Sequence, residues 1–256
     1  MTVYAFPSIT PSSSNVELIT NTRTFQSPIT GAVQTVGRKG SMWKITMQFN
    51  NLKDADRATM KAFLTKLNGQ EHRMYLNDHS AQRRGSAGAS DTLLVNGASQ
   101  TGRILQADGA PATAVTSYFK AGDYLSFNNE FHIVTEDVDV SSSGAFSFTA
   151  PATEIASGLS YTIVTVGTTD FTAIGASANT VGTTFTSTGV GEGTGTASTP
   201  GIPLAPPIRK PTTDNDPIDY ALPVFGVFML ASASSWDTQP GLVSNFQIEA
   251  VEDVLA

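Results

Sequence analysis

The chain has 256 residues and a net charge of −7, which is enough length for one large domain or two ordinary ones with a sizeable core. It contains no cysteine, which excludes disulfides and zinc–thiolate sites. No N-terminal signal pattern and no apolar run of about 18 residues occurs, so we expect neither a signal peptide nor a membrane span. Only 14% of residues are charged and small residues are abundant, which predicts mainly strands and turns.

The first 31 residues are rich in Ser, Thr and Pro and include one alternating run at 15–19. They predict an extended N-terminal arm that supplies an edge strand. Residues 32–36 predict a strand, and residues 43–49 predict a second one because apolar and polar residues alternate there. The connection 37–40 has glycine at both ends, so we expect it to join these two strands as a hairpin.

The next segment changes period and predicts one helix over about 53–68. Its apolar residues recur at helical spacing, namely Met60, Phe63, Leu64 and Leu67. Asn51 or Asp54 is the expected N-terminal cap, and Gly69 is the expected stop. A short strand follows at 73–76, so the pattern indicates a helix that lies across a curved antiparallel sheet.

Beyond this helix, residues 77–90 form a long polar loop that carries Arg83 and Arg84. Several short strands then follow over 91–155. Asn96-Gly97 and Asn128-Asn129 predict tight turns between them, because Asn and Gly tolerate positive φ.

Residues 156–201 are almost uncharged and rich in Gly, Thr, Ser and Ala, which predicts a small inserted β module. Its expected strands lie at 161–166, 171–174 and 183–186, with a flexible tip or return at 189–196. Further strands are expected at 224–230 and 246–250. We therefore expect a mainly β protein: an N-terminal β-barrel or sandwich-like domain with one helix at 1–90, a β-rich C-terminal domain at 91–155 plus 202–256, and the insert at 156–201.

Catalytic and cofactor motifs are largely missing from the sequence. His72 and His79 share neither a helix nor a cysteine, so a metal site there is not expected. Glu136, Asp137 and Asp139 offer paired carboxylates for glycoside cleavage, but at a strand end they are more typical of a solvated turn. We expect no catalytic, cofactor-binding or metal-binding residues.

Two other groups of residues have ordinary structural interpretations. Residues 214–216 (Asp-Asn-Asp) resemble the start of a calcium loop, but Asp219 stands where such a loop needs glycine. Trp43 and Trp236 are expected to be core or interface anchors rather than sugar platforms.

Charge is distributed unevenly along the chain. Thirteen of the 15 Lys and Arg residues lie in positions 1–120 with seven acidic residues, whereas the remainder has Arg209 and Lys210 against 15 acidic residues. This asymmetry suits self-assembly in which basic and acidic faces meet, or two modules with different surfaces. A dense basic patch with interleaved aromatic residues is missing, so specific nucleic-acid binding is not expected.

The segment SPITGAVQTVGRKGSMWKITMQFNNLKDADRATMKAFLTKLNGQEHRMYL resembles the N-terminal domain of distal tail proteins of long-tailed bacteriophages. The matching features are Gly40, Trp43, the helix at about 54–68, Gly69 and Tyr75. Residues 121–138, 205–210 and 246–254 look like the second half of that family. The segment 158–198, which interrupts this pattern, resembles a small β module of phage virion proteins.

This resemblance implies a non-enzymatic structural protein of the virion tail tip or baseplate, made in the host cytoplasm. It would form a ring, usually a hexamer, that joins the tail tube to the hub and to host-recognition proteins. The expected ring-facing elements are the segment 38–43, the loop 77–90 and the N-terminal arm.

The sequence also allows two other functions. A carbohydrate-binding or receptor-binding tail module would use the insert and its aromatic residues Tyr161, Phe171 and Phe185 to bind host glycan. A glycoside hydrolase would use Glu136 and Asp139.

Overall fold

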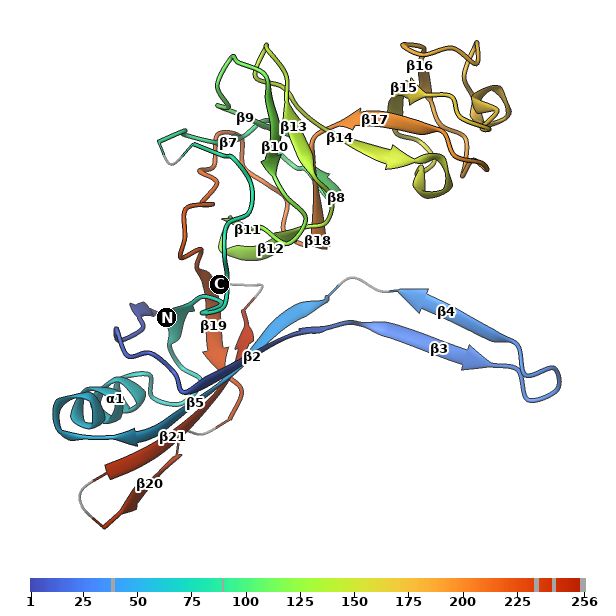
Figure 1. Cartoon of the computed structure of the whole chain (residues 1–256). Coiled ribbons are helices and arrows are strands. Elements are labelled where there is room, and N and C mark those ends of the chain that lie inside the picture. Colours follow the sequence, from blue (N-terminus) through green and yellow to red (C-terminus); the bar gives the residue numbers. More distant parts are fainter. Residues whose placement is uncertain (38–39, 89, 233–234, 241–242, 254–256) are drawn as a thin grey trace.

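The first sheet combines strands from both ends of the chain in the computed structural model, which describes residues 1–37, 40–88, 90–232, 235–240 and 243–253. Its strand order is β1-β6-β19-β21-β5-β2, with β20 also beside β21 (Figure 1). Only β1 and β6 pair in parallel among these described strands. The strands are β1 (Val3–Ala5), β2 (Ser13–Ile19), β5 (Met42–Leu52), β6 (Arg73–Leu76), β19 (Gly226–Leu230), β20 (Ser235–Gln239) and β21 (Val243–Glu252).

The predicted helix is confirmed as α1 (Asp54–Lys66), which packs on this sheet. Alternation along β5 points its apolar side chains toward the helix, and these are Trp43, Ile45, Met47 and Phe49. The helix contributes its apolar stripe to the same core, with Met60, Phe63, Leu64 and the following Leu67 all buried.

The helix ends differ in how well the sequence predicted them. Lys53 precedes the helix, and no side chain caps its start, so the predicted caps Asn51 and Asp54 were wrong. Both residues adopt positive φ in a sharp entry to the helix. The C-terminal stop is confirmed, because Asn68 and Gly69 leave the helix with φ of 48° and 65°.

The predicted hairpin between residues 32–36 and 43–49 was wrong. β4 (Val33–Gly37) pairs with β3 (Thr22–Gln26), while β5 pairs with β2. Two of the residues expected in the hairpin turn, Arg38 and Lys39, lie outside the described residues. The β2–β5 pair is therefore followed by the β3–β4 pair, which projects from the body of the molecule (Figure 1).

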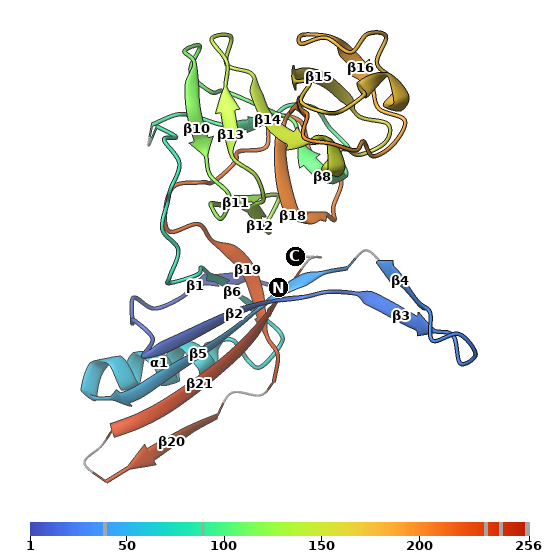
Figure 2. The same ribbon diagram turned by 45° about the vertical axis from the view of Figure 1, so that its right-hand side comes forward.

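A second body stands above the first sheet and contains the middle of the chain (Figures 1 and 2). One of its sheets has the order β11-β12-β18-β8, and a short pair is formed by β7 and β9. Their bounds are β7 (Leu94–Val95), β8 (Gly102–Leu105), β9 (Ala107–Asp108), β11 (Tyr124–Phe127), β12 (Glu130–Val134) and β18 (Ile202–Ile208). The predicted turn at Asn128-Asn129 is confirmed, with φ of 51° and 62° between the paired strands β11 and β12.

The other large sheet of this body has the order β10-β13-β14-β17-β15-β16. Its strands are β10 (Val115–Phe119), β13 (Val138–Val140), β14 (Phe146–Pro151), β15 (Ser160–Thr165), β16 (Thr184–Thr186) and β17 (Thr196–Pro200). The insert 156–201 therefore shares a sheet with the preceding strand, because β17 pairs with both β14 and β15.

Two short 3-10 helices accompany this sheet, η1 (Ala152–Glu154) and η2 (Phe171–Ile174). The strand predicted at 171–174 was wrong, since η2 occupies it. The Asp170 carboxylate accepts a hydrogen bond from the Thr172 N–H at 3.0 Å, and Gly175 ends the turn with φ of 110°. Local side-chain capping thus outweighs the strand propensity of this segment.

The C-terminal strands also lie in a different place from the one predicted. The segments 224–230 and 246–250 were assigned to the C-terminal domain, but β19 and β21 complete the first sheet. β21 pairs with β5 and buries Phe246, Ile248 and Ala250 in the helix-covered core. The chain thus leaves the first body after β6 and returns to it at β19.

Candidate functional site

The pair β3–β4, called here the arm and defined as residues 22–37, projects from the body of the molecule (Figure 1). Within the described residues, β3 and β4 pair only with each other. All ten of their residues are exposed. At about 3.3 Å per residue, the arm extends about 25 Å from Thr22 to its tip near Ile29.

The arm carries apolar side chains where a solvated hairpin would be expected to carry polar ones. Phe25 is 54% exposed and Ile29 at the tip is 92% exposed, and Val33 and Val36 are exposed as well. An isolated two-stranded hairpin is at best marginally stable in water, and its unpaired edges invite another chain. The arm therefore has the properties of a segment whose apolar side chains and strand edges are covered by a partner.

A buried ionic cluster joins the two bodies. Arg209, which follows β18, donates from both terminal nitrogens to the carboxylate of Glu252 on β21, at 2.6 and 2.7 Å. Glu252 also accepts hydrogen bonds from the Trp43 N–H at 3.1 Å and from the Phe131 N–H at 2.8 Å. One carboxylate of the first sheet thus holds groups from both bodies.

Glu130 forms the second half of this cluster. Its carboxylate accepts hydrogen bonds from the backbone N–H groups of Arg209 and Lys210, at 3.1 and 2.8 Å. Burial alone would raise the pKa of Glu130, but the His132 ring and the Arg209 guanidinium outweigh it and hold this pKa below its usual value of 4.5. The charged side chains of this cluster and the backbone N–H groups that they bind hold the two bodies together.

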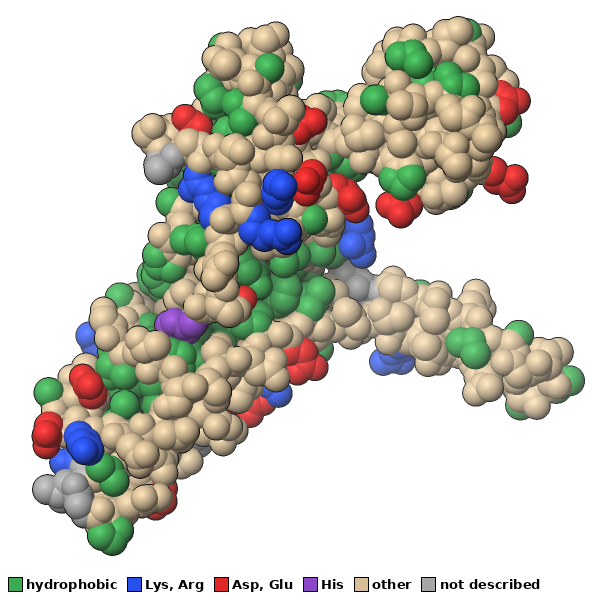
Figure 3. Space-filling model, in the orientation of Figure 1, with side chains coloured by type: hydrophobic (Ala, Val, Ile, Leu, Met, Phe, Trp, Pro, Cys, Tyr) green, Lys and Arg blue, Asp and Glu red, His purple; other side chains and the backbone are tan. Residues whose placement is uncertain are grey.

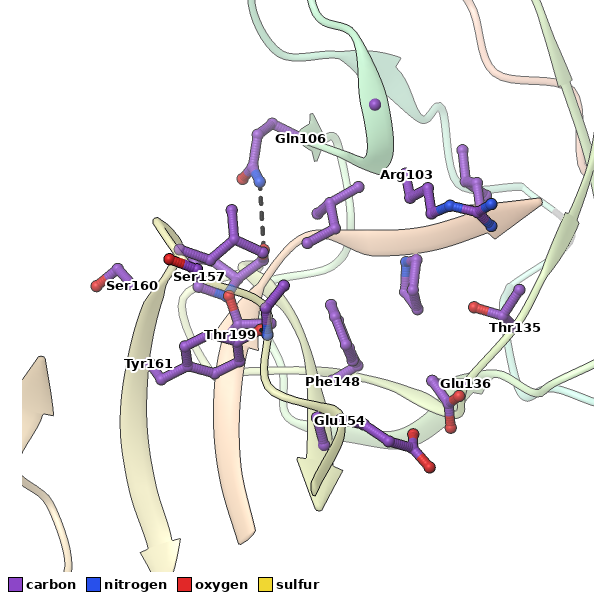
Figure 4. A pocket seen from close by; sticks show the side chains of 18 of the residues that line it. Arg103, Gln106, Thr135, Glu136, Phe148, Glu154, Ser157, Ser160, Tyr161 and Thr199 are labelled. Atoms are coloured by element: carbon purple, nitrogen blue, oxygen red, sulfur yellow. Dashed lines mark hydrogen bonds between the residues drawn. The ribbon is translucent and has the colours of Figure 1, made fainter. Parts of the chain in front are cut away.

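A groove of about 680 Å³ lies between the insert and the sheet that contains β8 and β18 (Figure 4). Its floor is apolar and includes Phe148, Leu159 and Pro203, and its rim carries hydroxyl groups. Glu136 and Glu154 lie close together on one side, and Arg103 lies elsewhere on the lining (Figure 4). Burial, followed by the nearby charges of Glu154 and Asp137, raises the pKa of Glu136.

The carboxylates that the sequence grouped stay near one another, because Glu136, Asp137 and Asp139 all line a hollow of about 460 Å³, but their contacts differ. Glu136 points into the groove, whereas Asp137 accepts a hydrogen bond from the Ala121 N–H at 3.0 Å. Asp139 accepts one from the Ser117 N–H at 2.7 Å. Glu136 also lies near Glu154, which the sequence did not suggest because it lies 18 residues away at the end of η1.

The candidate metal residues have other surroundings. His72 packs edge-on against the Tyr4 ring, and His79 lines a separate groove of about 490 Å³ beside the N-terminal segment. Asp214 accepts a hydrogen bond from the Gly97 N–H at 2.7 Å, so it links its own segment to one 117 positions earlier. No cluster of His, Asp and Glu suited to a metal ion occurs among the described residues.

The aromatic residues expected on the surface of the insert are buried. Tyr161, Phe171 and Phe185 are 5% exposed or less and form the core of the insert, so the expectation of exposed aromatic sugar platforms was wrong. Trp43 is also a core residue, and its indole N–H donates to the Phe131 carbonyl at 2.7 Å. Trp236 is 41% exposed, with the Lys61 ammonium over its ring.

The loop 77–90 is packed rather than projecting along much of its described length. The Asp123 carboxylate accepts hydrogen bonds from the backbone N–H groups of Arg84 and Gly85, at 2.8 and 3.0 Å. The Arg83 guanidinium lies over the Tyr220 ring. This loop therefore connects the first body to the second. Of the expected N-terminal arm, 1–31, β1 and β2 lie in the first sheet, and only the part from Thr22 onward belongs to the arm defined above.

No protein-family model matches this sequence, and no relative is found among curated proteins. In the described part of the chain, none of the helices has the length and apolar composition needed to cross a membrane.

Proposed function

We propose that this chain is a structural virion protein, a distal tail adaptor whose copies close into a ring at the tip of a phage tail. Six copies are the expected number, and the ring joins the tail tube to the hub and host-recognition proteins. The observation that carries the proposal is the exposed arm, whose apolar residues and unpaired strand edges are unsatisfied in a single copy.

Three further features support it. The sequence resembles distal tail proteins over the segment that forms β4, β5, α1 and β6. Basic residues concentrate in the first 120 positions and acidic residues in the rest, which allows unlike faces of neighbouring copies to meet. The ionic cluster at Glu252 and Arg209 fixes the two bodies to each other, so a contact made by one body positions the other.

The experiment is to replace the apolar arm residues with serine in one variant, Phe25→Ser, Ile29→Ser and Val36→Ser. Negative-stain electron microscopy of the wild type should show rings with a central opening, and the variant should show only small particles. A matched control, Val181→Ser with Val190→Ser, removes exposed apolar groups from the insert and should leave the rings intact. A wild type that forms no rings would contradict the proposal, and rings that persist in the arm variant would show that the arm does not hold them together.

A further inference from the structure

The arm has two different faces. Its pairing places Arg23 opposite Val36 and Phe25 opposite Gln34, so these four side chains share one face. The opposite face carries Thr22, Thr24, Gln26 and their partners, which are mostly polar. One face of the arm thus combines a cation with two exposed apolar side chains.

The groove beside the insert has the complementary composition. Its floor is apolar, and its only charged lining residues among those described are Arg103, Glu136 and Glu154. No ion pair holds either glutamate within the described part of the chain. Burial raises the pKa of Glu136, and the nearby carboxylates of Glu154 and Asp137 raise it further, so a cation placed between Glu136 and Glu154 would be favourable.

We propose that this groove receives the arm of a second copy of the chain. Arg23 of the incoming arm enters between Glu136 and Glu154, and Phe25 and Val36 lie on the apolar floor. The groove and the arm of a single chain do not share a contact, since no arm residue lines the groove. This inference rests on the proposed ring and names the surface that each arm occupies.

The geometry of such a contact agrees with ring formation. Arm and groove are different surfaces, so each copy offers one of each and the interface is heterologous. A heterologous contact repeats around a closed ring if its rotation closes. Figure 3 shows acidic side chains on the second body, across the open space from the arm, whose face in this view is largely uncharged.

A charge exchange between copies tests the proposal directly. Arg23→Glu alone and Glu154→Lys alone should each weaken self-association about tenfold, which is about 1.4 kcal/mol. The double variant carries both changes and restores an unlike pair, so its association should return toward that of the wild type. Sedimentation velocity over a concentration series measures all four proteins. Glu192→Lys is the matched control, because Glu192 is exposed on the insert but does not line the groove.

Crosslinking gives an independent readout, because the chain has no cysteine of its own. Gln34→Cys in one copy and Ser160→Cys in another should be joined by a short bismaleimide, whereas Gln34→Cys with Val181→Cys should not. Ser160 lines the groove, and Val181 does not.

The possible failures are distinguishable. A wild type that assembles, with no effect of Glu154→Lys and no Gln34–Ser160 crosslink, would overturn this inference and leave the ring proposal standing. A wild type that stays monomeric at every concentration would overturn both.

Discussion

Among single residues, Arg209 and Glu252 make the contact on which the arrangement of the two bodies depends. Both side chains are 5% exposed or less, and their hydrogen bonds extend to Glu130, Trp43 and Phe131. A buried ion pair contributes little net stability compared with apolar residues of similar size. Removal of one partner, however, leaves the other charge buried and unpaired.

Arg209→Met should therefore lower the free energy of unfolding by about 3–5 kcal/mol, because Glu130 and Glu252 are left buried without their cation. Urea unfolding followed by circular dichroism measures this change. The control is Lys44→Met, which breaks the more exposed pair of Lys44 with Glu249 and should have little effect. Equal effects of the two substitutions would contradict a special role for the buried cluster.

Glu130 predicts a pH dependence of the same cluster. Its pKa is lowered on folding, so its charged form stabilises the folded state above the unfolded pKa of about 4.5, and this stability is lost as pH falls through the folded pKa. The difference in unfolding free energy between wild type and Glu130→Gln should be constant near pH 7 and shrink below pH 4.5. A difference that stays constant into that acidic range would contradict the assignment.

The sequence could predict some of these residues and not others. Trp43 was identified as an anchor because strict alternation along its strand gives one buried face. Glu252 and Glu130 gave no such signal, since their role depends on pairing across 43 and 79 positions of the sequence with Arg209. The one available indication was that Arg209 is one of two basic residues in an otherwise acidic half.

Among the elements, the arm was predicted with the wrong pairing, and the error has a physical cause. Period-two alternation reports a strand with one buried face. The strands of the arm are exposed on both faces in a single copy, so β3 showed no alternation and β4 was assigned to the nearest strong strand, β5. Alternation does not reveal a segment that the rest of its own chain leaves unburied. The helix was predictable because its stripe packs within the chain.

Gly201 links the last strand of the insert, β17, to β18, and this connection requires a backbone conformation with positive φ. It lies between β17 and β18 with φ of 110°, and a Cβ there would lie 2.5 Å from Ile104 Cγ2 and 2.9 Å from the Leu105 carbonyl. Gly201→Ala should destabilise the protein by about 1–3 kcal/mol. Thermal unfolding measures the change.

The matched control is Gly189→Ala, because a Cβ on Gly189 would have no atom within 4 Å and this glycine does not adopt positive φ. This control should shift the unfolding free energy by less than about 0.5 kcal/mol. Similar shifts for both variants would show that the close approach at Gly201 is relieved easily.

For the whole molecule, the order of the strands along the chain did not indicate which strands share a sheet. The final strands follow the second body in sequence, and β21 nevertheless pairs with β5, about 200 positions earlier. Local patterns predicted that these strands exist and that the fold is mainly β, and both are confirmed. They could not predict which sheet a strand joins, because that is decided by long-range pairing and by the helix-covered core.

Opposite charge in the two parts of the chain is also a property of the whole molecule. If Arg23 and the groove carboxylates contribute to assembly, added salt should screen them and weaken it, since the Debye length falls from about 10 Å at 0.1 M to about 3 Å at 1 M. Sedimentation velocity at the two salt concentrations should show a shift toward monomer in high salt. An unchanged distribution would remove the electrostatic contribution and leave the apolar contacts of the arm.

Self-assembly is tested most simply by the absolute mass of the purified 256-residue chain in dilute, low-salt buffer, measured by light scattering over a concentration series. Closure into a ring predicts one species at a fixed multiple of 26.9 kDa, near six, which persists on moderate dilution. A mass of 26.9 kDa at every concentration would contradict ring closure, because the arm would then have no partner among copies of its own chain.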